Sequence, residues 1–140
     1  MSTIVCAVDR SPGAAEALQV ATSLTESLRG RLVLAHVAEG YRLPHGEAGV
    51  TGRQAGQGAK RLLDQVAAEH GLNGDVDRRA EVGDRAAELA RVAREEAAML
   101  IVLGSRRQGL FGRQLSSSLA AELRAIAPCA VVVVPPEPRG

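Results

Sequence analysis

The stretch of this chain best suited to chemistry is rich in glycine, arginine and serine. It opens with Gly104-Ser105-Arg106-Arg107, continues through Gly109 and Gly112, and reaches Ser116-Ser117-Ser118 at the start of an expected helix. Glycines let a backbone approach a phosphate, N–H groups at a helix N-terminus attract anions, and arginines add positive charge. The pattern predicts a phosphate cradle. A pliable loop with a serine N-cap and two solvated arginines is the alternative that spacing alone leaves open.

Asp9 is a second candidate because it directly follows a short apolar run, residues 3–8. A carboxylate there accepts hydrogen bonds from a ribose or a base, or joins a metal site; the alternative is a local turn bond to the backbone near Ser11. His36 is expected to be structural rather than catalytic. The chain has a single lysine, Lys60, no Gly-x-Ser-x-Gly elbow and no P-loop. We therefore name no catalytic residue and no metal ligand, and we do not expect an enzyme.

Composition indicates one small globular domain. The 140 residues are 46% hydrophobic and 24% charged, which is ordinary, but they include only one Phe, one Tyr and no Trp. The core is therefore expected to consist of Ala, Val, Leu and Ile, which pack well between a parallel sheet and its helices. We predict a single domain over residues 1–136, followed by a short tail over residues 137–140.

Charge and hydropathy narrow the range of partners. The net charge is +1, from 17 basic and 16 acidic residues, so no large basic surface for nucleic acid or an acidic membrane is expected. The scarcity of aromatic residues also argues against base stacking. No stretch approaches the roughly 18 consecutive apolar residues of a membrane span, and the first residues lack the features of a signal peptide. A cytoplasmic protein is the expectation.

Apolar runs alternate with segments of helical periodicity along the whole chain. The runs predict strands at residues 3–8, 31–38, 75–82, 99–103 and 130–134. The periodic segments predict four helices: from Ser11 as N-cap to Gly30, over residues 51–70, from Gly83-Asp84 onward, and up to a stop near Pro128. Such alternation predicts an α/β fold, a single doubly wound five-stranded parallel sheet with helices on both faces.

The expected strand order is 3-2-1-4-5, as in flavodoxin-like proteins. Residues 75–82 alternate between apolar and charged side chains, which is typical of an edge strand. In this order a crevice opens beyond the carboxyl ends of the first and fourth strands, where Asp9–Gly13 and Gly104–Gly112 lie, so both candidates fall in one place. Cys6 and Cys129 would be about 10 Å apart, or two strand spacings, which is too far for a disulfide.

Several segments together resemble the universal stress protein family. Residues 4–12 (IVCAVDRSP) are similar to its opening strand and Asp-x-Ser turn, and His36-Val37 to the end of its second strand. Gly83-Asp84, residues 100–106 (LIVLGSR) and residues 127–134 (APCAVVVV) resemble later landmarks. The resemblance covers essentially the whole chain. It implies a Rossmann-like fold of the adenine nucleotide alpha hydrolase-like type and a regulatory role in the stress response.

The resemblance also implies an adenine-nucleotide site. Asp9 and the Val37 backbone would hold the ribose and the adenine, while the turn after the fourth strand would surround the phosphates. The full set of nucleotide-binding residues implied in this way is Ala7, Val8, Asp9, Val37, Leu103, Gly104, Arg106, Arg107, Gly109, Ser117, Ser118 and Leu119.

The phosphate motif departs from the pattern of ATP-binding members, which is Gly, two residues, Gly, nine residues, then Gly and Ser or Thr. The corresponding positions here are Gly104, Arg107, Ser117 and Ser118, so two glycines are replaced. A side chain at Ser117 crowds the closest approach of backbone to phosphate, while Arg107 either bonds a phosphate or fills its place. The resemblance therefore implies a partly degraded site with weak or absent ATP binding.

The implied ligand is ATP or AMP, with Mg²⁺ as an optional companion, and the family also has members that bind no nucleotide. Members commonly dimerise through the last strand, and an apolar edge fits a homodimer of that kind; its residues here are Val131, Val132, Val133 and Val134. The leading interpretation is a homodimeric stress-response module that binds a nucleotide without turnover. An interaction protein that has lost nucleotide binding and a slow ATPase are the alternatives.

Overall fold

The computed structural model describes residues 2–11, 13–39, 50–72, 76–105 and 119–136. It contains a five-stranded sheet in the order β3-β2-β1-β4-β5, and every neighbouring pair is parallel. The predicted fold class and strand order are thus confirmed. The strands are β1 (Thr3–Ala7), β2 (Arg31–Ala38), β3 (Asp77–Val82), β4 (Leu100–Gly104) and β5 (Ala130–Val134).

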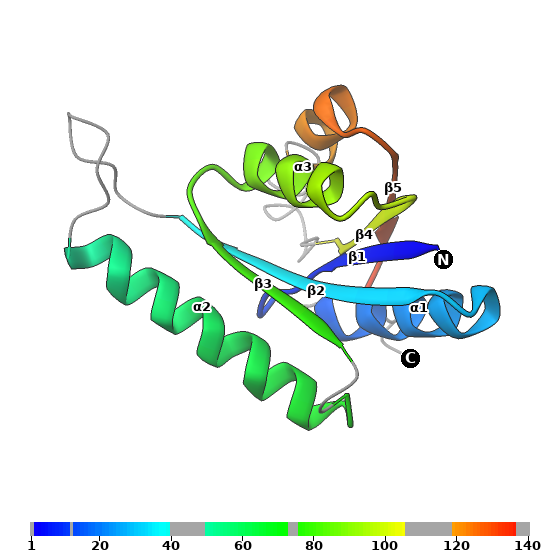
Figure 1. Ribbon diagram of the computed structural model, residues 1–140, viewed down its shortest axis with the longest axis horizontal. Helices are drawn as coiled ribbons and strands as arrows, with labels where there is room; N and C mark the ends of the chain where they lie inside the picture. The colour runs from blue at the N-terminus through cyan, green and yellow to red at the C-terminus, as the bar shows by residue number, and fades with distance from the viewer. Residues whose placement is uncertain (1, 12, 40–49, 73–75, 106–118, 137–140) are drawn as a thin grey trace.

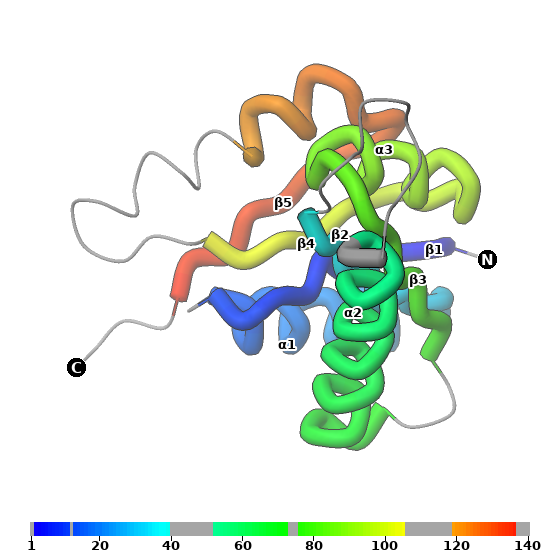
Figure 2. The backbone as a smooth tube through the Cα atoms, turned by 90° about the vertical axis from the view of Figure 1, so that its left-hand side faces the viewer, coloured from blue at the N-terminus to red at the C-terminus, as the bar shows by residue number. Residues whose placement is uncertain are grey.

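Helices cover both faces of the sheet (Figure 1). One face carries α1 (Ala14–Leu28) and α2 (Val50–Glu69), and the other carries α3 (Arg85–Glu95) and a helical segment over residues 119–126. The tube in Figure 2 shows the sheet lying between these two layers. None of the helices in the described ranges is long and apolar enough to span a membrane.

The core is split by the sheet into two apolar layers. Strand residues alternate between the layers, because successive side chains of a strand point to opposite faces. Ile4 and Cys6 pack toward α1 and α2 together with Leu18 and Leu63, while Val5 belongs to the other layer. The second layer, toward α3 and residues 119–126, also includes Val33, Leu89, Ile101 and Leu123. Aliphatic side chains build both layers, as the composition predicts.

Two helix ends differ from the sequence expectations. Ser11 is not the N-cap of α1: Gly13 occupies that position without a side-chain bond, and the Ser11 hydroxyl donates to Asp9 instead. α1 ends at Leu28, and its C-cap Arg29 takes the left-handed conformation (φ 51°) just before the expected stop at Gly30. The expected start of α3 is confirmed, because the Asp84 carboxylate accepts a hydrogen bond from the Ala87 N–H at 3.0 Å.

The two cysteines are free thiols: Cys6 lies on β1, Cys129 directly precedes β5, and β4 lies between these two strands, as expected. Cys6 is fully buried in β1, and this burial, with a further contribution from the charge of Asp9, raises its pKa to about 12. Cys129 is only partly buried, and its pKa is also raised by burial. Both thiols therefore stay protonated near neutral pH.

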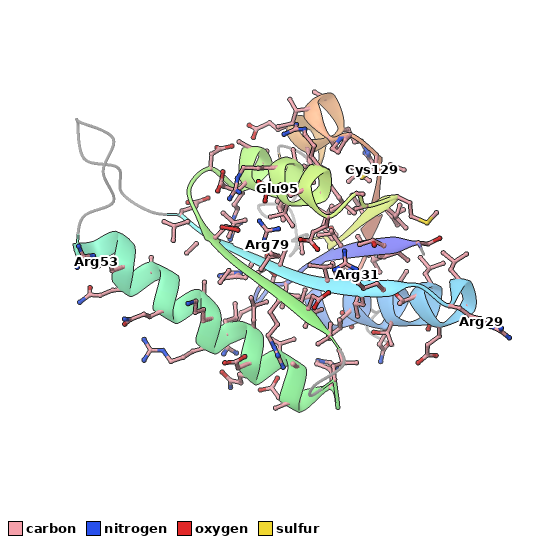
Figure 3. All side chains as sticks on the ribbon, viewed as in Figure 1. Arg29, Arg31, Arg53, Arg79, Glu95 and Cys129 are labelled. Carbon is pink, nitrogen blue, oxygen red and sulfur yellow. The ribbon has the colours of Figure 1, made fainter. Side chains whose placement is uncertain are left out.

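β3 forms one edge of the sheet and is held to α3 by a network of ion pairs. Arg79 contacts Glu81 at 3.0 Å, Glu95 at 2.6 Å and Glu96 at 2.8 Å. Arg91 contacts Glu88 at 2.8 Å, Glu95 at 2.9 Å and Glu81 at 3.1 Å, so the two arginines share Glu81 and Glu95. Figure 3 shows Arg79 and Glu95 in the gap between β3 and α3. Charged residues therefore occupy the face of this edge strand that the alternation predicted to be polar.

Arg79 is the centre of this network, with 21% of its side chain exposed. We expect Arg79→Gln to lower the free energy of unfolding by about 2 kcal/mol at pH 7, between the values for surface and buried pairs, because three ion pairs are lost and only Arg91 and Arg31 remain to balance their carboxylates. Urea denaturation measures this change. Arg78→Gln is the matched control, since Arg78 lies on the opposite face and pairs with the exposed Asp64 at 3.3 Å; it should cost under about 1 kcal/mol.

The same variant has a predictable pH dependence. Hydrogen bonds from Arg79 and then Arg91 lower the pKa of Glu95 below its ordinary value of 4.5. A lowered pKa contributes stability that is present above the ordinary value and is lost as pH falls through the folded pKa. The difference between wild type and Arg79→Gln should therefore shrink as pH falls below 4.5. An equal difference at pH 4 and pH 7 would contradict this assignment.

Candidate functional site

The turn after β1 and the end of β4 meet at backbone distance. A Cβ added to Gly104 would lie 2.5 Å from the carbonyl carbon and oxygen of Gly13 and 2.9 Å from the Ala14 nitrogen. A Cβ added to Gly13 would lie 2.6 Å from the Ser105 oxygen. The Ser105 N–H in turn donates to the Val134 oxygen at 2.7 Å, which ties the same point to β5. The two sequence candidates are therefore adjacent, as the predicted strand order requires.

Asp9 shapes the turn that follows β1. Its Oδ1 accepts hydrogen bonds from the Ser11 N–H at 2.8 Å and the Ser11 hydroxyl at 2.5 Å. This is the local turn bond that the sequence left open as an alternative. His36 holds the same turn from β2, with its Nδ1 2.6 Å from the Val8 oxygen. Because a carbonyl only accepts, Nδ1 carries the proton and Nε2 is left with its own hydrogen-bonding capacity.

A cavity of about 660 Å³ opens beside this turn, and we call it the arginine cavity. Its polar lining consists of Asp9, Arg10, Ser11, His36, Arg61, Gln65 and Arg85. The walls come from the β1 turn, the end of β2, one face of α2 and the start of α3. A hydrogen bond of 2.6 Å from the Arg10 guanidinium to the Gln65 side-chain oxygen joins the β1 turn to α2.

A much smaller space adjoins the arginine cavity, and we call it the crevice. It measures about 20 Å³ and shares Asp9, His36 and Arg85 with the larger cavity. A volume of that size holds about one water molecule. The remaining lining consists of Ala7, Val8, Ala35, Val37, Leu89 and Leu119.

The crevice brings together five residues that the sequence placed at a nucleotide: Ala7, Val8, Asp9, Val37 and Leu119. Leu103 and Gly104 lie at the end of β4 beside β1, where Leu103 is buried and Gly104 packs on Gly13. The other expected residues lie outside the described part of the chain; they are Arg106, Arg107, Gly109, Ser117 and Ser118. Gly104 therefore has a packing reason to be glycine that is independent of any phosphate.

Sequence reasoning did not find the basic wall of the arginine cavity. Arg10, Arg61 and Arg85 come from three separate segments, and each reads in the sequence as an ordinary solvated charge. One weak signal was available for the α2 face, because Gly58, Arg61, Leu62 and Gln65 follow helical spacing. The tertiary fold alone brings that face opposite the Asp9 turn.

The electrostatics of the cavity favour an anion. Three arginines and one carboxylate line it, which leaves an excess of two positive charges with His36 neutral. In the part of the chain that the structure describes, Arg85 forms one ion pair, a long one of 3.7 Å to the exposed Glu39. Among the described residues, no group of three or more His, Cys, Asp or Glu side chains is arranged to hold a metal ion. The arrangement suits recognition of a small anionic molecule.

Fold and site together define a Rossmann-like α/β protein with a polar opening at the point where the strand order reverses. The sequence matches the family model described as Universal stress protein family over residues 1–135. Because this match spans nearly the whole chain, the chain belongs to the universal stress protein family. No curated protein matches the sequence at a significant level.

Solved structures agree with this assignment. A protein of the universal stress protein family from Burkholderia pseudomallei is 28% identical, with 97% of this chain and 96% of that chain covered and a TM-score of 0.68. A universal stress protein in complex with cAMP is 19% identical, with coverage of 97% and 98% and a TM-score of 0.69. The Archaeoglobus fulgidus protein in complex with dAMP is 19% identical, with coverage of 96% and 98% and a TM-score of 0.66. At these identities the last two show a shared fold.

The contact between the two turns leads to a stability prediction. Gly104→Ala should lower the free energy of unfolding by about 2–3 kcal/mol, because the added methyl group must push two backbones apart. Gly56→Ala is the control: its Cβ would meet only Val82 Cγ2 at 3.6 Å, and the change should add about 0.5–1 kcal/mol to the stability of α2. Chemical denaturation of both variants measures the effect. Wild-type stability in Gly104→Ala would mean that the close approach is not a constraint.

Proposed function

We propose that this chain is a regulatory module of the stress response that binds an adenine nucleotide and does not turn it over. The observation that carries the proposal is the convergence of Asp9, the Val37 end of β2 and the Gly104 end of β4 at one edge of the sheet. Ligands of doubly wound folds bind at this edge, at the switch point. The cAMP and dAMP complexes of two proteins with the same fold support the choice of ligand class.

In this proposal the ribose lies against Asp9 and the adenine lies over the end of β2. A carboxylate accepts hydrogen bonds at both of its oxygens, so Asp9 could accept from the ribose hydroxyls. The Val37 backbone at the crevice would meet the edge of the base. The 5′-phosphates would extend toward Gly104 and the segment that contains Arg107, Ser117 and Ser118.

A nucleotide enters the crevice only if side chains move. The present volume of about 20 Å³ is far below the few hundred Å³ of a small-molecule site. Arg85 and Leu119 are the side chains best placed to move, because both are partly exposed. Their displacement would join the crevice to the larger cavity, with which it already shares Asp9. This cost of opening is consistent with the weak binding that the altered glycine motif implies.

Titration calorimetry with AMP and ATP, on protein freed of co-purified ligand, tests the proposal. We expect saturable binding with Kd below about 1 mM. Asp9→Asn keeps an oxygen for Ser11 but removes the charge, and it should weaken AMP binding about ten-fold, because hydrogen bonds to charged groups contribute about 1.5–3 kcal/mol. Asp64→Asn, a matched change on the exposed surface of α2, should leave affinity unchanged.

The alternatives give different results in the same experiment. A Kd weaker than about 1 mM for both nucleotides would favour an interaction protein that has lost its ligand site. Phosphate release from ATP should stay at background. Release that is measurable in wild type and disappears in Asp9→Asn would establish a slow ATPase and overturn the claim that the ligand is not turned over.

The second part of the proposal is a homodimer through β5. This strand is the edge opposite β3, and Val131, Val132 and Val133 are only partly buried in it. An exposed apolar edge strand has unpaired backbone groups on its outer side, and pairing with a second copy would satisfy them. The charged, ion-paired edge at β3 lacks this apolar character.

Sedimentation equilibrium tests the assembly directly. We expect a dimer, and we expect Val132→Lys to shift the equilibrium toward monomer, because the lysine places a charge beside the pairing edge. Arg78→Lys, on the β3 edge, should leave the dimer intact. A monomeric wild type at tens of micromolar protein, or a dimer lost equally in both variants, would contradict pairing through β5.

A further inference from the structure

We propose that the arginine cavity binds a second phosphoryl group, esterified to the 2′ or 3′ hydroxyl of the ribose, so that the preferred ligand is an adenosine bisphosphate. This inference rests on the proposed nucleotide site and extends it. The 5′-phosphates in that site extend toward the end of β4, and they leave the cavity of about 660 Å³ on the α2 side of Asp9 without an occupant.

The excess positive charge of the cavity favours the binding of a phosphoryl group. Arg10 donates its hydrogen bond to a neutral amide, that of Gln65, so its charge is not neutralised there. Within the described ranges Arg61 has no ion-pair partner, and Arg85 has only the long contact to Glu39. Guanidinium groups present several N–H donors in a geometry that matches phosphate oxygens. The positive charge of the three guanidinium groups that line the cavity exceeds the single negative charge of the Asp9 carboxylate.

The basic wall is partly fixed in place before any ligand arrives. Arg61 and Gln65 are four residues apart on α2, so they lie side by side on one face of the helix. The 2.6 Å bond from Arg10 to Gln65 brings the Arg10 guanidinium to that same face. One N–H of Arg10 is used in this bond, and its other donors remain for a ligand. Pre-positioned donors lose less conformational freedom on binding than free side chains do.

Asp9 explains why the second phosphate belongs on the ribose. It lines both the crevice and the arginine cavity, so it stands at their junction. A ribose held at Asp9 therefore has one hydroxyl edge directed toward the cavity. A phosphate ester on that edge would place its oxygens among Arg10, Arg61 and Arg85. Repulsion from Asp9 is moderated because Oδ1 already accepts two hydrogen bonds from Ser11.

Space for the group comes from Gly58. A Cβ at this position would meet no atom within 4 Å, and Gly58 lies one turn before Arg61 and Leu62 on the wall of the cavity. A glycine in a helix interior is unfavourable for the helix. The lack of a side chain at Gly58 nevertheless leaves this part of the cavity open. Gly58→Leu should therefore fill the cavity while it improves the helix.

Calorimetry with four probes tests the inference: AMP, ADP, adenosine 2′,5′-bisphosphate and adenosine 3′,5′-bisphosphate. We expect one bisphosphate to bind at least about ten-fold more tightly than AMP, as charge-assisted bonds to arginine permit. ADP carries the same number of phosphoryl groups, both in the 5′ chain, so it controls for phosphate number. We call the ratio of bisphosphate affinity to AMP affinity the bisphosphate advantage. Arg61→Gln and Gly58→Leu should each reduce this ratio to about two-fold or less and leave AMP affinity within about two-fold of wild type.

Arg53→Gln is the matched control, because Arg53 is an exposed arginine of α2 outside the cavity lining; Figure 3 places it near the first turn of that helix. It should keep the full bisphosphate advantage. If AMP binds and neither bisphosphate binds more tightly, the inference falls and the proposed function stands. A bisphosphate advantage that survives both Arg61→Gln and Gly58→Leu also overturns it. If none of the four probes binds, the inference and the proposed nucleotide site fall together.

Discussion

The close approach of Gly13 and Gly104 is the constraint on which the candidate site depends. Two turns separated by most of the chain touch through backbone atoms, and neither position has room for a Cβ. This contact fixes where β1 and β4 end relative to each other, and therefore where Asp9 stands. His36 adds a second restraint by bonding the Val8 oxygen from β2. These contacts hold together the carboxyl ends of β1, β2 and β4, where a ligand would bind.

Sequence periodicity could predict the fold because each signal was local. Continuous apolar runs marked the central strands, and the alternation at residues 75–82 marked the edge strand β3. The errors were at helix ends, where two local signals competed. Ser11 had the chemistry of an N-cap, but its hydroxyl was taken by Asp9 two residues earlier. α1 ended before the expected stop at Gly30, with Arg29 as its C-cap in the left-handed conformation.

The candidate site was predicted only in part, for a physical reason. Asp9 and Gly104 follow strands, so the strand order alone placed them together. The basic wall depends on which face of α2 turns toward β1, and on how α3 begins after β3. Neither is encoded in a short motif: Arg61 is one of several polar residues on a long helix, and Arg85 follows an N-cap. Long-range packing determined these positions: helical spacing groups Arg61 with Gln65 on one face of α2, but it does not show which part of the fold that face meets.

The two edges of the sheet differ in a way that bears on how large an assembly can become. β3 is lined by Asp77, Arg78, Arg79 and Glu81, most of them engaged in ion pairs, whereas β5 is a run of valines after Ala130. If two copies join by their valine edges around a two-fold axis, both outer borders of the combined sheet are charged. Strand addition then has no further apolar edge to use, so growth closes at a pair and does not continue into fibres.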